Sequence, residues 1–129
     1  MKALITGGAG LMGSTLAARR PAHWSAEVTQ HVTPALQREG VKRHTVDLAQ
    51  PLAFFGLAER RRPDLVIHTA YAKTEPQVTV DSTTEVASAC AALDIPLVHM
   101  STDAIFDGDH APYDEDDPPS PIHAYGRSK

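Results

Sequence analysis

The sequence predicts an α/β fold, a doubly wound parallel sheet of about five strands, on the basis of three observations. Strand-like and helix-like segments alternate along the 129 residues, which is typical of a parallel sheet with helices on both faces. Two of the strands, at residues 65–67 and 96–100, are continuous apolar runs, as expected where both faces of a sheet are covered. A glycine-rich turn follows the first strand and opens the first helix.

The expected elements follow from the apolar pattern and from the turn residues between the runs. Strands are expected at residues 3–6, 27–32, 43–46, 64–69 and 96–101, and helices at residues 11–20, 51–61 and 78–93. From residue 106 to residue 123 the composition changes to Asp, Pro, Gly and Ser, which predicts a long loop. We expect residues 1–129 to form a single dinucleotide-binding domain.

The composition excludes several classes of protein. A net charge of −4 and short, dispersed basic clusters argue against a nucleic-acid surface. The single cysteine, Cys90, cannot form an internal disulfide, and its Ala-rich surroundings favour a small buried thiol. The chain shows neither a signal peptide nor an apolar run of membrane-spanning length. We therefore expect a cytoplasmic protein without nucleic-acid, membrane or metal partners.

The glycine turn has the spacing Gly7-x-x-Gly10-x-x-Gly13. Small residues let the chain turn sharply and bring its backbone N–H groups against a pyrophosphate at a helix N-terminus. Glycine-rich turns also occur for steric reasons alone, but the position between an N-terminal strand and an apolar helix favours nucleotide binding. The turn predicts a Rossmann-type fold, with Gly7, Gly10, Leu11, Met12 and Gly13 contacting the dinucleotide.

Other candidate cofactor residues directly follow the later strands, because open parallel sheets bind ligands at their carboxyl edge. Asp47 and Leu48 follow the third strand, where a carboxylate could accept a hydrogen bond from adenine or could cap the next helix. Thr69, Ala70 and Tyr71 follow the fourth strand, where a small residue permits close approach of a ligand or simple packing.

The sequence gives less information on whether the cofactor carries a 2′-phosphate on its adenosine ribose, as NADP does, or lacks it, as NAD does. A carboxylate at the end of the second strand would bind the adenosine ribose diol and favour NAD, but residues 28–36 contain none. Arg38, or His31 with Thr33, could face a 2′-phosphate, although Arg38 is also typical of a surface residue. The cofactor is therefore expected to be NADP or NAD, with a lean to NADP.

Candidate catalytic residues occupy the fifth strand end and the last segment. Ser101 and Thr102 bring hydroxyls directly after an apolar strand. Tyr125 and Lys129 are four apart and would share one helix face, where an ammonium can lower the pKa of a phenol. Such a phenol can protonate a carbonyl oxygen while hydride reaches the carbon. The Tyr-x-x-x-Lys spacing alone is common by chance, but with the hydroxyls and the glycine turn it is specific.

The sequence resembles the extended short-chain dehydrogenase/reductases, most closely the dTDP-4-dehydrorhamnose reductase-like branch that acts on sugar nucleotides. The strings that carry the resemblance lie at residues 6–13, 101–108, 112–118 and 125–129, in the family's order and spacing. Family members continue beyond the Tyr-Lys helix with further strands and a small substrate domain, so the resemblance implies an N-terminal portion. This chain has His68-Thr69-Ala70 where the family usually has Asn-Ala-Ala.

The resemblance implies an NAD(P)-dependent reduction of a 4-keto sugar nucleotide. It implies that Thr102, with Ser101, orients the substrate carbonyl, that Tyr125 is the general acid, and that Lys129 tunes it. It also implies that Tyr125 and Lys129 contact the cofactor.

Two other functions remain open. The same branch resembles the regulatory β subunit of methionine adenosyltransferase, which implies a non-catalytic binding or regulatory role. An inactive, truncated product is the other alternative, because Lys129 ends the chain. An exposed edge at the fifth strand would favour dimerisation, or a partner that covers it.

Overall fold

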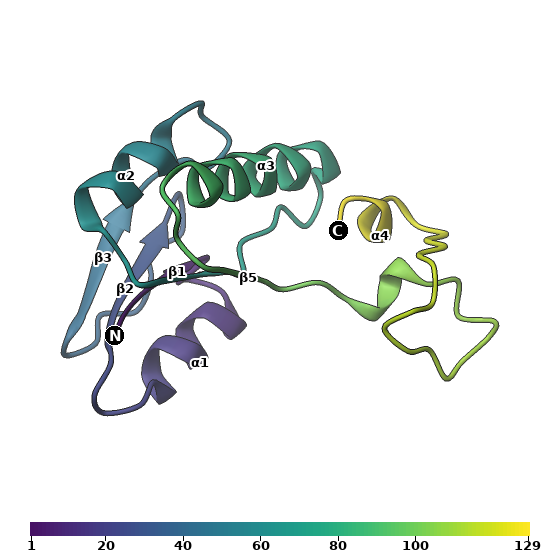
Figure 1. The fold of residues 1–129 in the computed structure, drawn as a ribbon, viewed down its shortest axis with the longest axis horizontal. Coiled ribbons are helices and arrows are strands. Elements are labelled where there is room, and N and C mark those ends of the chain that lie inside the picture. The colour runs from purple at the N-terminus through teal and green to yellow at the C-terminus, as the bar shows by residue number, and fades with distance from the viewer.

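The computed structural model describes residues 1–129 and contains one five-stranded sheet with helices on both faces (Figure 1). The strands run in the order β3-β2-β1-β4-β5, and every neighbouring pair is parallel. The elements are β1 (Lys2–Thr6), α1 (Leu11–Arg19), β2 (Ser25–Gln30), β3 (Val41–Thr45), α2 (Ala53–Arg61), β4 (Leu65–His68), α3 (Pro76–Ala92), β5 (Leu97–His99), the 3₁₀ helix η1 (Asp103–Ile105) and α4 (Ala124–Arg127). The predicted doubly wound parallel sheet is confirmed.

β1 lies at the centre of the sheet because its side chains pack against helices on both faces. Ala3 and Ile5 belong to a cluster that includes Ala17 of α1, whereas Leu4 belongs to a cluster formed with α2 and α3. Each of these three strand residues is at most 2% exposed. The alternation follows the two-residue period of a strand, which sends successive side chains to opposite faces.

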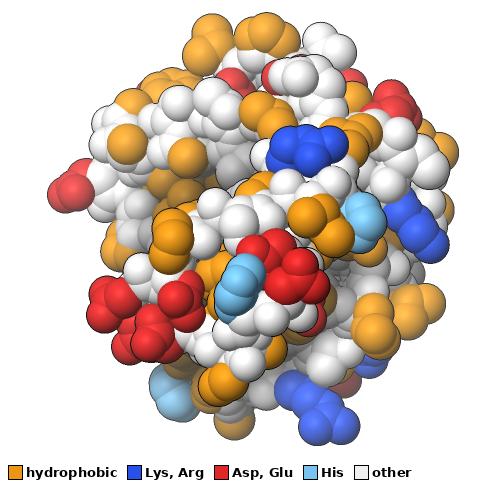
Figure 2. Space-filling model, turned by 90° about the vertical axis from the view of Figure 1, so that its right-hand side faces the viewer, with side chains coloured by type: hydrophobic (Ala, Val, Ile, Leu, Met, Phe, Trp, Pro, Cys, Tyr) orange, Lys and Arg blue, Asp and Glu red, His pale blue; other side chains and the backbone are white.

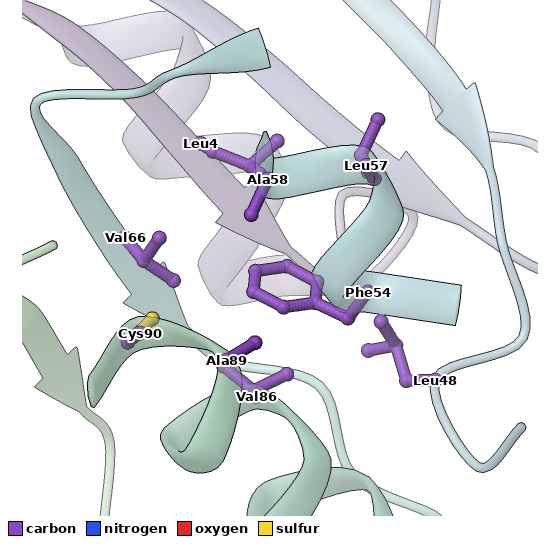
Figure 3. Packing of buried hydrophobic residues seen from close by; sticks show 9 residues of the cluster. All are labelled: Leu4, Leu48, Phe54, Leu57, Ala58, Val66, Val86, Ala89 and Cys90. Carbon is purple, nitrogen blue, oxygen red and sulfur yellow. The ribbon is translucent and has the colours of Figure 1, made fainter. Parts of the chain in front are cut away.

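The larger core cluster fills the space between the sheet and helices α2 and α3 (Figure 3). The fully buried ring of Phe54 lies among side chains from both the sheet and α3, including Leu4, Val66 and Ala89. Cys90 belongs to the same cluster, and burial raises the pKa of its thiol to about 11. The predicted small buried thiol is confirmed, and at neutral pH it remains a protonated packing group.

Two strands begin two residues earlier than the sequence predicts. The second was predicted at residues 27–32, but β2 begins at Ser25, whose N–H donates to the carbonyl of Met1 at 3.0 Å. β3, predicted at residues 43–46, begins at Val41. β3 is an edge strand with mostly exposed, polar side chains, so hydrophobic periodicity does not mark its start.

Other bounds differ by one or two residues, for local reasons. α3 was predicted from residue 78 but begins at Pro76, since a helix does not need the N–H that proline lacks at its first position. α2 was predicted from residue 51 but begins after Leu52, which adopts a left-handed φ of 61°. β5 is shorter than predicted and lies at the sheet edge, with Val98 47% exposed. None of the helices is both long and apolar enough to cross a bilayer.

The segment between η1 and α4 is ordered by a small cluster of its own side chains. The rings of Phe106 and Tyr113 stack with their centroids 4.3 Å apart. The Tyr113 hydroxyl donates to Asp107 at 2.5 Å and accepts from the N–H of Gly108 at 2.8 Å. Figure 2 faces this end of the molecule, where acidic side chains gather in groups and basic ones stand apart.

A buried ion pair connects helix α2 to strand β2 of the sheet. Glu27 of β2 is 4% exposed and accepts hydrogen bonds from Arg61 of α2, at 2.7 Å from Nε and 2.5 Å from Nη2. His44 of β3 lies 2.6 Å from the same carboxylate. The hydrogen bond from Arg61 is the main reason that the pKa of Glu27 falls to about 2. The carboxylate is therefore fully engaged by α2 and β3.

Replacing Glu27 by Gln is expected to lower the free energy of unfolding by about 2 kcal/mol, because the buried side chain loses its charged hydrogen bonds with Arg61. The loss is smaller than for a fully buried pair, since the Arg61 side chain remains 30% exposed and water can solvate it. Urea denaturation at pH 7 measures the effect. As a control, Glu59→Gln on the exposed side of the same helix should change stability by no more than about 0.5 kcal/mol.

The same pair predicts an acid dependence of stability. Folding lowers the pKa of Glu27 from 4.5 to about 2, so its contribution is complete above pH 4.5 and is lost as the pH falls toward 2. The stability difference between the native protein and the Glu27→Gln variant should shrink across that window. A difference that stays constant from pH 5 to pH 2 would contradict the assignment.

Candidate functional site

Gly7 and Gly13 bring three backbone segments together at the end of β1. Gly7 has a φ of +71°, and a Cβ at this position would lie 2.9 Å from the Cα of Ala70. A Cβ at Gly13 would collide with the carbonyl oxygen of Gly7. The N–H of Gly10 donates to that same carbonyl at 2.9 Å. These glycines therefore let α1 and the segment after β4 approach the turn more closely than a side chain would permit.

The N-terminus of α1 is open at this turn. Gly10 is the N-cap, no side chain caps the helix, and the first turn contains no acidic residue. Leu11 is 87% exposed and Met12 is 49% exposed. Because the first N–H groups of a helix have no intrahelical partner, this end is suited to bind an anion.

The side chain of Thr6 connects the ends of β1 and β4. Its hydroxyl accepts from the N–H of Thr69 at 3.1 Å and from the N–H of Ala70 at 3.2 Å. The Thr69 hydroxyl donates back to the carbonyl of Thr6 at 2.6 Å. Thr6 is fully buried and was not among the residues predicted from the sequence. Its signal was available, because it is a polar residue that ends an otherwise apolar strand.

A pocket of about 320 Å³ opens along the carboxyl edge of the sheet, beside the glycine turn. It is lined by the segments that follow β1, β2, β3 and β4, and by two residues of α3. Seven of the predicted cofactor residues line it, namely Gly7, Gly10, Asp47, Leu48, Thr69, Ala70 and Tyr71. Leu11, Met12 and Gly13 lie in the adjoining first turns of α1 and are not part of the lining.

Asp47 has a structural role as well as a place in the pocket. Its carboxylate accepts from the N–H of Ala49 at 3.0 Å and from the side chain of Gln50 at 3.3 Å. The residue caps this turn and not α2, whose N-cap is Leu52. Thus the helix-cap alternative does not hold for α2, and Asp47 remains a fixed negative charge in the pocket wall.

Tyr125 and Lys129 meet Tyr71, which itself lines the pocket. The two aromatic rings lie 5.7 Å apart at an interplanar angle of 57°. The Nζ atom of Lys129 is 5.0 Å from the ring centroid of Tyr71 and 6.0 Å from that of Tyr125. Burial lowers the pKa of the Lys129 ammonium. Helix α4 carries the phenol and ends at Arg127, so Lys129 brings its ammonium to the pocket edge from beyond the helix. The prediction that Tyr125 and Lys129 share one helix face is therefore wrong, because the helix ends too early.

The two candidate hydroxyls after β5 differ in their surroundings. The Thr102 hydroxyl accepts from the N–H of Ala104 at 3.3 Å, as the N-cap of η1, and donates to Asp103 at 3.1 Å. Ser101 is exposed. Because η1 and α4 are in contact, Thr102 begins the element against which the Tyr125 helix packs. Neither residue lines the pocket.

Two stacked histidines lie at the ends of β4 and β5, and the sequence did not reveal them. The rings of His68 and His99 have centroids 5.4 Å apart. His68 contacts the hydroxyls of Thr6 at 2.8 Å and Thr83 at 3.2 Å, and burial is the main reason that its pKa falls to about 4. Burial is also the main reason that the pKa of His99 is lowered, and the positive charge of Lys129 acts in the same direction. Both rings are therefore neutral at physiological pH.

The strand order, the glycine turn and the pocket at the carboxyl edge define a Rossmann-type fold. The chain belongs to the RmlD substrate binding domain family, whose model matches residues 1–129, and the family resemblance predicted from the sequence is confirmed.

The sequence is similar to several characterised proteins over nearly its whole length. Methionine adenosyltransferase 2 subunit beta of Mus musculus is 31% identical, over 99% of this chain and 40% of the relative. The dTDP-4-dehydrorhamnose reductase of Burkholderia thailandensis is 32% identical, over 100% of this chain and 43% of the relative. The structure of WbmG from Bordetella bronchiseptica, solved in complex with NAD, has a TM-score of 0.86 at 23% identity, over 99% of this chain and 46% of that one. The chain thus spans less than half the length of these proteins.

Replacing Gly13 by Ala is expected to destabilise the fold by about 1–3 kcal/mol, because the new methyl group would collide with the Gly7 carbonyl. Thermal melting measures the change. Gly56→Ala is the matched control, since its Cβ would meet only the mobile end of Arg60, at 3.2 Å, and alanine stabilises a helix interior by up to about 1 kcal/mol. If both variants melted alike, the close approach at Gly13 would be refuted.

Proposed function

We propose that this chain is the nucleotide-binding part of an NAD(P)-dependent reductase that converts the C4 ketone of a sugar nucleotide into an alcohol. The observation that carries the proposal is the meeting of Tyr125 and Lys129 with Tyr71, which lines the pocket beside the glycine turn. The dTDP-4-dehydrorhamnose reductase relative supports the substrate class.

The residues around the pocket fit a dinucleotide. Gly7 and Gly13 let the segment after β4 and helix α1 pack directly against the turn, which places the N-terminus of α1 beside the pocket. The uncapped start of α1 offers N–H groups to a pyrophosphate. The NAD complex of WbmG, which shares the fold, supports the same cofactor class. The residues proposed to hold the cofactor are Gly7, Gly10, Leu11, Met12, Gly13, Asp47, Leu48, Thr69, Ala70, Tyr71, Tyr125 and Lys129.

In this proposal the protein's own side chains donate the proton to the ketone oxygen and orient the ketone. The dinucleotide, when bound, supplies a hydride to the ketone carbon. Tyr125 donates its phenolic proton to the ketone oxygen as the carbon is reduced. Lys129, placed near both aromatic rings, stabilises the phenolate that remains. The hydroxyls of Thr102 and Ser101 orient the ketone oxygen by hydrogen bonds.

We propose NADP as the preferred form of the cofactor. The support is that residues 28–36, which form the end of β2 and the segment after it, contain no carboxylate. Calorimetric titration of the protein with NADPH and with NADH tests the preference. Tighter binding of NADH would contradict it.

A non-catalytic binding subunit is the second candidate, and the match to the methionine adenosyltransferase subunit favours it. Under this alternative the pocket binds a dinucleotide without reducing a substrate. Co-purification with a partner enzyme, together with cofactor binding and no turnover of any keto sugar nucleotide, would favour it over the reductase.

Replacing Tyr125 by Phe is expected to lower kcat by about 10²–10⁴-fold, because the variant cannot give a proton to the ketone oxygen. The assay follows oxidation of the reduced nicotinamide with a 4-keto sugar nucleotide, in the native protein with any sequence that follows Lys129. Cofactor affinity should fall much less than kcat, because the aromatic ring of residue 125 remains and the other residues proposed to hold the cofactor are unchanged.

Tyr113→Phe is the matched control, because it also removes one phenolic hydroxyl. Tyr113 stacks on Phe106 and donates to Asp107 in the segment after η1. It should keep turnover near that of the native protein. The reductase proposal fails if Tyr125→Phe retains full turnover, or if the native protein reduces no 4-keto sugar nucleotide.

A further inference from the structure

Lys129 carries a partly buried ammonium that has no ionic partner. None of the ion pairs in the structure includes it, although burial lowers its pKa. His68 and His99 lie near it, and burial together with the charge of Lys129 keeps the pKa values of both imidazoles low. These neutral rings cannot offset the ammonium. Because removing a charge from water is costly unless another group compensates it, the ammonium needs a different partner.

The ring of Tyr71 is the closer of two aromatic rings that meet this ammonium. The Nζ atom lies 5.0 Å from the ring centroid of Tyr71 and 6.0 Å from that of Tyr125. The face of an aromatic ring attracts a cation within about 6 Å. The Tyr125 contact is at this limit and the Tyr71 contact is well inside it, so Tyr71 is the main partner of the ammonium.

Buried threonines fix the main chain on both sides of Tyr71. The Thr6 hydroxyl accepts from the two N–H groups of residues 69–70, directly before Tyr71. The Thr79 hydroxyl accepts from the N–H of Ala72 at 2.9 Å and donates to the carbonyl of Ala72 at 3.2 Å. Thr79 is fully buried in the first turn of α3, the end of that helix beside α4 (Figure 1). The chain at Tyr71 is thus held in place from two elements.

We propose that Tyr71 is a positioning residue, whose ring holds the Lys129 ammonium beside the phenol of Tyr125. The inference rests on the proposed function, in which Tyr125 donates a proton and Lys129 stabilises the phenolate. A reacting group must be held by a support that is itself fixed, and the two threonines give Tyr71 that property. This role needs the face of the ring and does not need the Tyr71 hydroxyl.

Nuclear magnetic resonance of the lysine side chains tests the contact without any turnover. Protons over the face of an aromatic ring resonate upfield, so the methylene protons next to Nζ of Lys129 should lie upfield of those of the exposed Lys42 and Lys73. In Tyr71→Leu most of this displacement should disappear, and in Tyr71→Phe it should remain. Tyr71 is 51% exposed, so both variants should melt as the native protein does.

Kinetics of the same variants test the consequence for the reaction, in the native protein with any sequence that follows Lys129. Tyr71→Leu should lower kcat by about fivefold, the loss expected for a partly desolvated contact between a cation and a ring. Tyr71→Phe keeps the ring and should recover most of that loss. The KM for the cofactor is measured separately, because Tyr71 also lines the pocket.

A double-mutant cycle with Lys129→Met separates a role through the ammonium from a direct contact with the ligands. Lys129→Met removes the cation and keeps an unbranched side chain. In that background Tyr71→Leu should lower kcat by less than about twofold, because the two residues act as one unit. A loss of about fivefold that persists without the ammonium would overturn the positioning role.

The results also distinguish this inference from the proposed function. If the Lys129 protons resonate with those of Lys42 and Lys73, or if Tyr71→Leu leaves them unmoved, the role of Tyr71 is overturned while the reductase proposal stands. The same holds if Tyr71→Phe loses as much kcat as Tyr71→Leu, since the hydroxyl would then be the active group. If the resonances move as expected but the native protein reduces no 4-keto sugar nucleotide, the proposed function fails and the placement of Lys129 by Tyr71 is supported.

Discussion

The close approach of main chain between the end of β1 and the end of β4 is the constraint on which the site depends. Thr6 accepts two N–H groups from the β4 end, and Gly7 lies so near Ala70 that no side chain fits between them. Gly13 brings α1 against the same turn. Since the pocket wall, the open helix end and Tyr71 all follow from these contacts, their loss would disturb every part of the site.

Charge along the carboxyl edge is divided between structural and free groups. Glu27 and Arg61 form an ion pair where α2 meets the sheet, with His44 against the same carboxylate, and Glu27, the one acidic residue of β2, does not line the pocket. The histidine pair at the ends of β4 and β5 stays neutral because it is buried. The ammonium of Lys129 lies near the phenol of Tyr125, and the imidazole of His31 lies in the pocket wall.

The sequence was sufficient to predict the order of the elements, because buried parallel strands and amphipathic helices leave strong local patterns. It was not sufficient for the starts of β2 and β3, where Ser25 is polar and β3 lies exposed at an edge. The glycine turn and the residues after each strand were predicted by their positions. The contacts of Thr6 with His68, and of His68 with His99, depend on strand pairing between residues far apart in the chain, 62 positions in the first case.

The central claim is that the carboxyl edge of this sheet holds a nicotinamide dinucleotide across the glycine turn. Hydrogen exchange of the backbone amides, with and without NADPH, tests it most directly. The account predicts slower exchange at residues 10–13 of the α1 start and at residues 31–33 after β2, with β3 and the exposed face of α2 unchanged. Unchanged exchange at the glycine turn under saturating NADPH and NADH would contradict it.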